Sequence, residues 1–363
     1  MKVLVAPDSF KGSLSAAEAA QAMAQGVRKV WPDADIRLLP MADGGEGALD
    51  AILAAVPGER RSANVTDAAG RQIEVEYGVL ADGTAIIETA RIIGLMLPGV
   101  LDVAVEKRTT AGVGELIKHC LVSGIRRFMI GLGGSATNDG GIGMLQALGI
   151  RTAEQQGVLA ALDFLALDPR IAQSHITVLS DVTNPLCGPQ GATAVYGPQK
   201  GVRPQQMAQL DARLRRFGDL ADAWLGRTLS LQPGTGAAGG LGYALQLLRG
   251  EHRSGAGVLL ALSGFDAALQ GADLVLTGEG RSDRQTPAGK APWVVAQRAV
   301  KAGVPAVLVS GSIEDDDRAQ LKSQFTACIM LTSDTITPDM AMRDAGRLLA
   351  ERTAEAISGI LIP

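Results

Sequence analysis

The loop at residues 131–141, Gly-Leu-Gly-Gly-Ser-Ala-Thr-Asn-Asp-Gly-Gly, constrains the fold of this chain more than any other segment. The apolar run 127–130 before it predicts a buried strand, and residues 142–148 after it predict a helix. Such a glycine-rich connection from strand to helix is typical of α/β folds. Because glycine has no Cβ, backbone N–H groups here can approach an anion, and the helix start adds unpaired amides. The loop therefore predicts a phosphate site; a turn needed only for tight packing is the alternative.

Length and composition narrow the class of protein. A chain of 363 residues exceeds what one hydrophobic core usually supports, which predicts two domains. A net charge of −4 and an aromatic content of 3% argue against a nucleic-acid partner, which would need basic patches and stacking platforms. The 3 cysteines are widely spaced, so we expect no disulfide framework, no cysteine metal site and a reducing, cytoplasmic compartment. No apolar run approaches the roughly 18 residues of a membrane span, so no membrane partner is expected, and no feature indicates an oligomeric state.

The two ends of the chain share one alternation of strands and helices. Because neither end alone has enough strands for a stable α/β layer, we expect residues 1–60 and 270–363 to share one parallel sheet. Residues 61–269 begin with short antiparallel strands and are interpreted as an inserted mixed α/β domain. The predicted strands are 2–6, 35–40, 64–65, 73–79, 84–88, 127–130, 176–179, 272–276, 306–309 and 327–331. The first predicted helix is capped by Ser13 or Ser15 and continues to about Val30, and further predicted helices include 48–55, 291–302 and 338–357.

Polar loops follow the first two predicted strands. Asp8, Ser9 and Lys11 come directly after the first strand, at the sheet edge where open α/β folds bind ligands. Lys11 can provide a point charge for a phosphate or carboxylate, although a capped helix start with a solvated lysine has the same sequence. Asp43 and Glu46 lie at the next helix start, where carboxylates can hold Mg²⁺ through water or simply stabilise the helix.

Two further loops carry candidate polar groups in the middle of the chain. Asp181 follows the strand 176–179 and could accept a proton from a substrate hydroxyl or bind a metal, while Asn184 could donate a hydrogen bond. An Asx-type turn before a proline is the alternative for this segment. Lys200 lies in Gly-Pro-Gln-Lys-Gly, where proline and glycine restrict the backbone on both sides.

The glycine-rich segment 234–242 and the segment 277–290 complete the set of candidate loops. The first resembles a dinucleotide fingerprint but follows no clear strand, so we interpret it as a loop that enters a helix at a phosphate or carboxylate. The second is predicted to be a loop after a strand and gathers two carboxylates, Glu279 and Asp283, and two cations, Arg281 and Lys290, as a ligand site or as a structural ion-pair loop. The 3 histidines have no metal spacing and no nucleophile partner, so histidine-based nucleophilic catalysis is not expected.

Taken together and in order, these motifs resemble the class I (bacterial-type) glycerate kinase family. The matching segments are Ala6-Pro-Asp-Ser-Phe-Lys11, Ala42-Asp-Gly-Gly-Glu-Gly47, residues 133–141, Asp181-Val-Thr-Asn-Pro-Leu186, Gly197-Pro-Gln-Lys-Gly201, Gly236-Ala-Ala-Gly-Gly240 and Thr277-Gly-Glu-Gly-Arg281. The resemblance implies phosphorylation of D-glycerate at the 2-hydroxyl, with ATP and Mg²⁺. It also implies two α/β domains, one Rossmann- or flavodoxin-like with a parallel sheet and one a mixed α/β insertion, with the active site in the cleft between them.

Phosphoryl transfer depends mainly on positioning and charge neutralisation, which suggests roles for the matching residues. Asp181 or Asp283 would orient the attacking hydroxyl, and Asp43 or Asp139 would hold Mg²⁺. The remaining roles are given by group: cations for the transferring phosphoryl or the acceptor carboxylate at Lys11, Lys200, Lys290 and Arg281; substrate contacts at Asp8, Ser9 and Asn184; and nucleotide or phosphate contacts at Gly133, Gly134, Ser135, Thr137, Asn138, Gly239 and Gly240.

The chain departs from the family pattern in three places. Arg91 and Ile92 stand where the family has small residues, the chain has Gly112-Val-Gly-Glu115 where the family has Gly-Thr-Gly-Glu, and the segment 151–169 is shorter. A larger acceptor pocket would favour a kinase for a different small hydroxy acid or sugar acid. A non-catalytic metabolite-binding sensor that retains the cleft is the alternative from a different class of protein.

Overall fold

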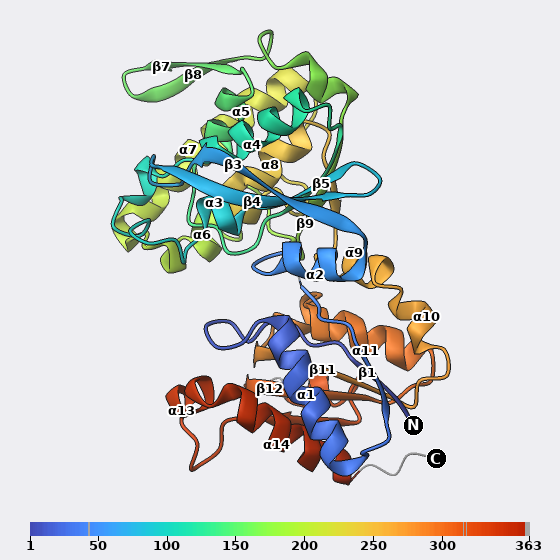
Figure 1. The fold of residues 1–363 in the computed structure, drawn as a ribbon. Coiled ribbons are helices and arrows are strands. Elements are labelled where there is room, and N and C mark those ends of the chain that lie inside the picture. The colour runs from blue at the N-terminus through green and yellow to red at the C-terminus, as the bar shows by residue number, and fades with distance from the viewer. Residues whose placement is uncertain (43, 315, 317, 360–363) are drawn as a thin grey trace. The chain divides into compact units, whose positions relative to one another are not determined.

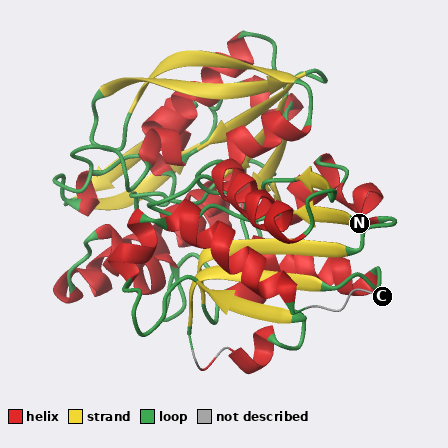
Figure 2. Ribbon diagram, turned by 60° about the horizontal axis from the view of Figure 1, so that its bottom comes forward, coloured by secondary structure: helices red, strands yellow, loops and turns green. Residues whose placement is uncertain are grey.

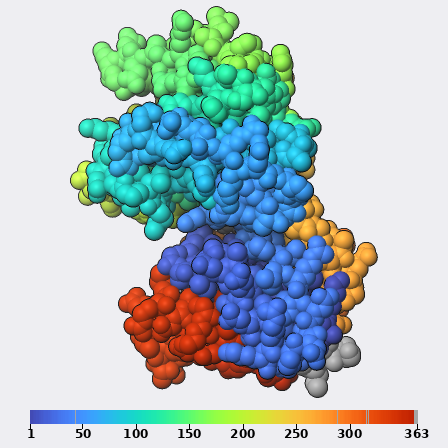
Figure 3. All heavy atoms as spheres, viewed as in Figure 1, coloured from blue at the N-terminus to red at the C-terminus, as the bar shows by residue number. Residues whose placement is uncertain are grey.

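The computed structural model describes residues 1–42, 44–314, 316 and 318–359, and it divides into two compact units. The first unit comprises Met1–Asp43, Asp50–Val56 and Ser254–Pro363, and the second comprises Gly44–Leu49 and Pro57–Arg253. Both ends of the chain contribute to the first unit, whose surface combines blue N-terminal and red C-terminal segments (Figure 3). Residues 254–269, which the sequence analysis assigned to the insertion, belong to this unit as well.

The first unit contains a parallel sheet of 5 strands in the order β13-β12-β11-β1-β2. Numbered along the unit's own sequence, this order is the flavodoxin-like 2-1-3-4-5 arrangement. The strands are β1 (Lys2–Val5), β2 (Asp35–Leu38), β11 (Leu274–Ser282), β12 (Ala306–Ile313) and β13 (Ala327–Met330). The parallel sheet expected from the two chain ends is therefore confirmed, and its switch point lies between β1 and β11.

Helices cover the sheet of the first unit. The helices α1 (Ala16–Val30) and α14 (Ala345–Ser358) pack against an apolar cluster that includes Val3, Leu276 and Val309 from three strands. Helices lie across the strands of this sheet in Figure 2. Helix α1 begins where the sequence predicts, since the Ser15 side chain and Glu18 form a capping box.

The segment predicted as a loop at 277–283 is instead the second half of β11, so that prediction was wrong. The strand continues to Ser282 and pairs with β12, which itself extends to Ile313. The glycines that suggested a loop allow two backbones to approach: a Cβ on Gly311 would lie 2.2 Å from the carbonyl oxygen of Gly280. The closing helix expected over 338–357 is also interrupted, because Asp344 departs from helical dihedral angles with φ −104° and ψ 20°.

The second unit contains a mixed sheet of 6 strands in the order β10-β9-β6-β5-β4-β3. The strands β3 (Gly58–Thr66), β4 (Gln72–Leu80) and β5 (Thr84–Glu88) are antiparallel neighbours, as predicted. The strands β6 (Arg127–Gly131), β9 (His175–Leu179) and β10 (Glu251–Arg253) then continue the sheet in parallel from β5. A separate hairpin, β7 (Arg151–Gln155) and β8 (Val158–Asp163), occupies the segment noted as shorter.

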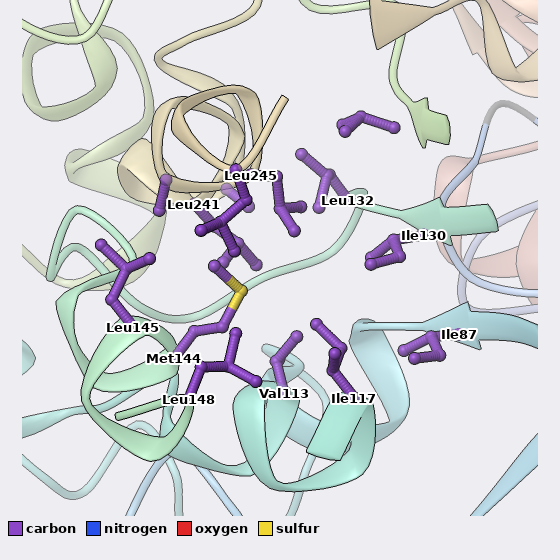
Figure 4. Close-up of a cluster of buried hydrophobic side chains, with 14 of the residues drawn as sticks. Ile87, Val113, Ile117, Ile130, Leu132, Met144, Leu145, Leu148, Leu241 and Leu245 are labelled. Carbon is purple, nitrogen blue, oxygen red and sulfur yellow. The ribbon is translucent and has the colours of Figure 1, made fainter. Parts of the chain in front are cut away.

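The core of the second unit holds the glycine loop between a sheet and helices. Side chains from β5 and β6, such as Ile87 and Ile130, lie near those of α4 (Ala111–Val122), α5 (Ile142–Ala147) and α8 (Leu241–Leu247) (Figure 4). Leu132, the second residue of the loop, and Met144, just after its end, are both buried in this cluster. The loop 131–141 is therefore anchored at both ends.

The remaining helices are short except α7, and Figure 1 labels most of them. They are α2 (Ala48–Ala55), α3 (Ala90–Ile93), α6 (Ala192–Tyr196), α7 (Pro204–Leu225), α9 (Gly255–Leu262), α10 (Phe265–Leu269), α11 (Ala291–Lys301), α12 (Arg318–Leu321) and α13 (Pro338–Arg343), with 3₁₀ turns η1 (Val105–Lys107), η2 (Pro169–Gln173), η3 (Pro198–Lys200), η4 (Ala237–Gly240) and η5 (Thr286–Ala288). Across the described ranges, none of the helices has the length and apolar character that a bilayer span requires.

Candidate active site

A pocket of about 400 Å³ lies in the first unit at the carboxyl ends of its parallel strands. Asp8, Ser9 and Lys11 line it from the loop after β1, and Glu279–Arg281 line it from the end of β11. It therefore spans the switch point between β1 and β11, where flavodoxin-like sheets bind their ligands. An apolar wall of Leu331, Pro338, Ala341 and Met342 completes it.

Asp8 is held in place by the backbone around it. Its amide donates to Gly278 O at 2.8 Å, and its carboxylate accepts from the Ser9 amide at 2.7 Å. The side chain is only 6% exposed although it lines the pocket, whereas Lys11 is exposed. The structure thus brings together the first three predicted substrate and catalytic residues.

Lys290 joins two carboxylates at the end of β11. Its ammonium lies 3.1 Å from Asp283 Oδ1 and 3.4 Å from Glu279 Oε2. Burial opposes ionisation of Asp283, but the Gln285 amide and Lys290 outweigh it and hold the pKa of Asp283 below its ordinary value. A carboxylate with a lowered pKa and a fixed cation is a weak base, so Asp283 suits a role in orienting Lys290.

Glu279 belongs to the predicted cluster at 277–290 but was given no role of its own in the sequence analysis. It is 5% exposed and accepts from Ser282 Oγ at 2.9 Å and from Thr286 Oγ1 at 2.7 Å. Burial raises the pKa of Glu279 above its ordinary value, against the opposing effect of Lys290. Its place at the carboxyl end of a buried strand is the signal that could have identified it.

Arg281 forms an ion pair with an acid other than Glu279 and Asp283. Its guanidinium pairs with Glu314, and its side chain is 66% exposed. The hydrogen bond to Glu314 raises the pKa of Arg281. Arg281 lines the same pocket as Lys11 and Lys290, so three cations surround it.

The second unit aligns three loops at one edge of its sheet. Glu88 pairs in register with Gly131, and Gly131 pairs with Leu179. The segments after β5, β6 and β9 therefore leave the sheet side by side. This register brings Glu88, the glycine loop and Asp181 to the same edge.

Glu88 was also missed as an individual site residue. It is buried and accepts from the amides of Gly47 at 3.1 Å and Leu49 at 3.0 Å, at the start of α2. Arg91 Nε lies 3.5 Å from its carboxylate. Arg91, which departs from the family pattern, therefore places a cation beside a buried acid. The sequence signal that could have identified Glu88 is a carboxylate at the end of an apolar strand.

Several amides of the glycine loop are occupied within the protein. Gly133 N donates to Gly44 O at 3.2 Å, Ala136 N to Ile93 O at 2.7 Å, and Gly140 N to Gly239 O at 2.9 Å. Gly134 has φ +73°, a conformation that glycine adopts without strain. The loop is a folded element, so only part of its backbone can serve a ligand.

Asp139 serves the start of two helices. Its carboxylate accepts from Thr110 N at 2.9 Å, Thr110 Oγ1 at 2.8 Å, Gly141 N at 2.9 Å and Gly143 N at 3.2 Å. These bonds connect α4 to the six-residue α5. Both oxygens are engaged by uncharged donors, which favours a structural role over the predicted role in Mg²⁺ binding.

Lys200 lies beneath the loop and not on its surface. It is 2% exposed and donates to Ser135 Oγ at 3.1 Å and Thr137 O at 2.7 Å. Burial, together with the nearby Arg108, lowers the pKa of Lys200 to about 7 against the opposing effect of Asp139. The contacts that the structure describes for Lys200 are with the loop, and its predicted contact with substrate stays a prediction.

The neighbouring polar side chains are only partly satisfied. Asn138 Nδ2 donates to Thr193 Oγ1 at 2.9 Å. In the described part of the chain, the Thr137 hydroxyl and the Asn138 amide oxygen are buried without a hydrogen-bond partner. Such atoms are uncommon in proteins, and they mark this loop as a place that a ligand or water completes.

Asn184 and Gly239 have local structural contacts. Asn184 donates to Gln190 O at 2.8 Å and accepts from Tyr196 OH at 2.8 Å, so its side chain closes its own loop. A Cβ on Gly239 would lie 2.0 Å from Thr137 O, and a Cβ on Gly240 would lie 2.7 Å from Gly140 Cα. These two glycines let α8 approach the loop, and the prediction that 234–242 enters a helix agrees with η4 and α8.

Asp8 is the acid of the first pocket that suits metal binding, since Glu279, which also lines the pocket, already lies beside Lys290. Among the described residues, no three His, Cys, Asp or Glu side chains group as metal ligands, and Asp43 lies outside those residues. Mg²⁺ on a nucleotide needs only one or two carboxylates, because phosphates and water supply the other ligands. Asp8, a carboxylate that lines the pocket, fits that requirement.

Comparison with known proteins agrees with this architecture. The model of the Glycerate kinase family matches residues 3–361. The chain is 42% identical to a glycerate kinase of Bacillus subtilis (strain 168), over 99% of this chain and 97% of that protein. It is 40% identical to the glycerate 2-kinase of Escherichia coli (strain K12), over 95% and 94% of the two chains. A crystal structure assigned to glycerate kinase 2 of Salmonella typhimurium LT2 superposes with a TM-score of 0.79 at 40% identity, and covers 98% of this chain and 96% of its own. This chain therefore belongs to the glycerate kinase family and is a kinase.

Proposed function

We propose that this protein transfers the γ-phosphoryl group of ATP to the 2-hydroxyl of D-glycerate and releases 2-phosphoglycerate and ADP. The observation that carries the proposal is the pocket at the switch point of the first unit, where Lys11, Arg281 and Lys290 surround one cavity. Phosphoryl transfer needs such cations, because charge on the transferring group must be neutralised. Relatives that cover nearly the whole chain are named for glycerate, which supports the choice of acceptor.

Charged side chains of the chain can carry each step of this phosphoryl transfer. The substrate hydroxyl oxygen attacks the γ-phosphorus, the bond from that phosphorus to the ADP oxygen breaks, and the hydroxyl proton passes to Asp181. Lys11 and Lys290 neutralise the transferring group, while Arg281 binds the acceptor carboxylate. Asp181 is preferred to Asp283 as the proton acceptor, because Asp283 is paired with Lys290.

Mg²⁺ would supply charge neutralisation on the nucleotide phosphates, with Asp8 as the residue that holds it. The rest of the phosphate contact is assigned to the glycine loop, in particular Gly133, Gly134 and Ser135. Asp8 is fixed by the Ser9 amide, so it can hold a cation without prior rearrangement.

A coupled ADP-release assay with a panel of hydroxy acids tests the proposal. We expect turnover with D-glycerate, and ³¹P NMR of the product should show 2-phosphoglycerate and not 3-phosphoglycerate. Turnover only with a larger acid would favour the alternative hydroxy-acid or sugar-acid kinase. Ligand binding without ADP release would favour a metabolite sensor.

A further inference from the structure

Two buried cations lie directly beneath the glycine loop of the second unit. Lys200 donates to the Ser135 hydroxyl and to the Thr137 carbonyl. Arg108 is also buried, and it donates to Ala136 O at 3.0 Å and to Lys200 O at 2.8 Å. The loop segment 135–137 is thus held from inside by both charged groups.

The acceptors of these two cations are uncharged oxygen atoms. Arg108 donates its other hydrogen bonds to the carbonyls of Val103 and Leu101. Neither cation takes part in an ion pair among the described residues. Burial lowers the pKa of both cations, and the charge of Asp139 opposes this effect at Lys200 as that of Glu106 does at Arg108. The Asp139 oxygens, however, accept their hydrogen bonds from Thr110, Gly141 and Gly143. Arg108, and Lys200 whenever it is protonated, therefore carry positive charge inside the loop that the protein does not neutralise by direct contact.

The Ser135 hydroxyl can transmit the effect of Lys200 to a ligand at the surface of the loop, because it can accept one hydrogen bond and donate another. Its oxygen accepts from the Lys200 ammonium, so its own proton must point to another acceptor. A hydroxyl that accepts from a cation becomes a stronger donor, because hydrogen bonds in a chain polarise one another. The Thr137 hydroxyl and the Asn138 amide oxygen, which have no hydrogen-bond partner among the residues that the structure describes, lie next along the same loop.

We propose that Lys200 is a positioning residue that polarises Ser135, and that the Ser135 hydroxyl donates to an oxygen of a phosphate group bound at the loop. Lys200 then supplies the charge without touching the ligand. The inference rests on the proposed function only in requiring a phosphate ligand, from the nucleotide or from the phosphorylated acid. A bound dianion favours the protonated amine, so ligand binding and protonation of Lys200 are coupled.

Titration calorimetry between pH 7.5 and 9 tests this coupling with ADP and Mg²⁺, with 2-phosphoglycerate, and with D-glycerate as the phosphate-free control. In this range the phosphates are already ionised, since their second pKa is about 6. We expect proton uptake on binding, measured in buffers of different ionisation enthalpy, and an affinity that falls about tenfold across the range. Uptake with ADP alone would assign the loop to the nucleotide, and uptake with 2-phosphoglycerate alone would assign it to the transferred group; either supports the proposal.

Two variants and one surface control complete the test. Lys200→Met should abolish both proton uptake and the pH dependence of affinity, and Ser135→Ala should weaken both while Lys200 remains. Lys118→Met, at an exposed lysine of the same unit, should behave as the wild type. If Lys200→Met does not fold, the wild type and Ser135→Ala still decide the question. Wild-type binding without proton uptake, equal uptake with D-glycerate, or an unchanged Ser135→Ala profile would overturn the proposal, whether or not the enzyme turns over glycerate.

Discussion

The Lys290 ammonium lies 3.4 Å from a carboxylate oxygen of Glu279, a residue that is only 5% exposed. Because Glu279 is also held by Ser282 and Thr286, it fixes the lysine at the edge of the pocket. A fixed cation costs no reorganisation when charge develops on the transferring group. This relationship holds Lys290 in a defined position at the pocket.

Replacing Lys290 should impair the reaction more than the fold. Lys290→Met keeps the length of the side chain but removes its charge, so we expect kcat/KM for glycerate phosphorylation to fall by roughly 10²- to 10³-fold. Lys290 directly precedes helix α11, and Lys301 is the exposed last residue of that helix. Lys301→Met is therefore the matched control and should leave kcat/KM unchanged. ADP-release kinetics and circular dichroism measure the two effects, and equal activity of the two variants would remove Lys290 from the mechanism.

Asp181 should be needed for turnover and not for folding. Asp181→Asn removes the proton acceptor but keeps the shape of the side chain, so kcat should fall by about two to four orders of magnitude. Asp102→Asn, at an exposed acid of the same unit, is the control and should retain wild-type kcat. Near-normal turnover of Asp181→Asn would assign the proton transfer to another group, with Asp283 the next candidate.

The sequence predicted the sheets better than it predicted individual side chains. Apolar runs with glycine-rich connections were enough to place both ends of the chain in one parallel sheet, because that pattern depends on local composition. The extension of β11 was missed because Gly278, Gly280 and Gly311 resemble a loop signal while they serve close strand pairing. Burial of Lys200 could not be foreseen, since it depends on Ser135 and Thr137, more than sixty residues away in the chain.

The pH dependence of the free energy of unfolding should reflect the burial of Lys200, even in the absence of a ligand. Its pKa is about 7 in the folded protein, below the ordinary value of a lysine, so the unfolded chain binds more protons between those two values. The free energy of unfolding should therefore rise with pH above about 7, by up to about 1.4 kcal/mol per pH unit from this group. Urea unfolding at pH 7 and 8.5 should show this rise in the wild type relative to Lys200→Met; parallel profiles would show that Lys200 does not titrate in this range.

Glycine should be required at position 239 because a side chain has no room there, and not only because of the positive φ. It has φ +66°, and a Cβ there would lie 2.0 Å from Thr137 O, the oxygen that Lys200 also contacts. Gly226 has a similar φ of +71° with no atom within 4 Å of the added Cβ. Alanine at Gly226 should therefore cost about 1 kcal/mol from the positive φ alone.

The same change at Gly239 should cost about 3 kcal/mol or more, because the Thr137 carbonyl must also move. Urea unfolding of the two alanine variants separates the contributions, since the difference between them measures the contact with the loop. The displaced carbonyl should also weaken ADP binding in Gly239→Ala, while Gly226→Ala should bind as the wild type does. Equal stability losses in the two variants would show that the approach of η4 to the glycine loop is not what requires glycine at 239.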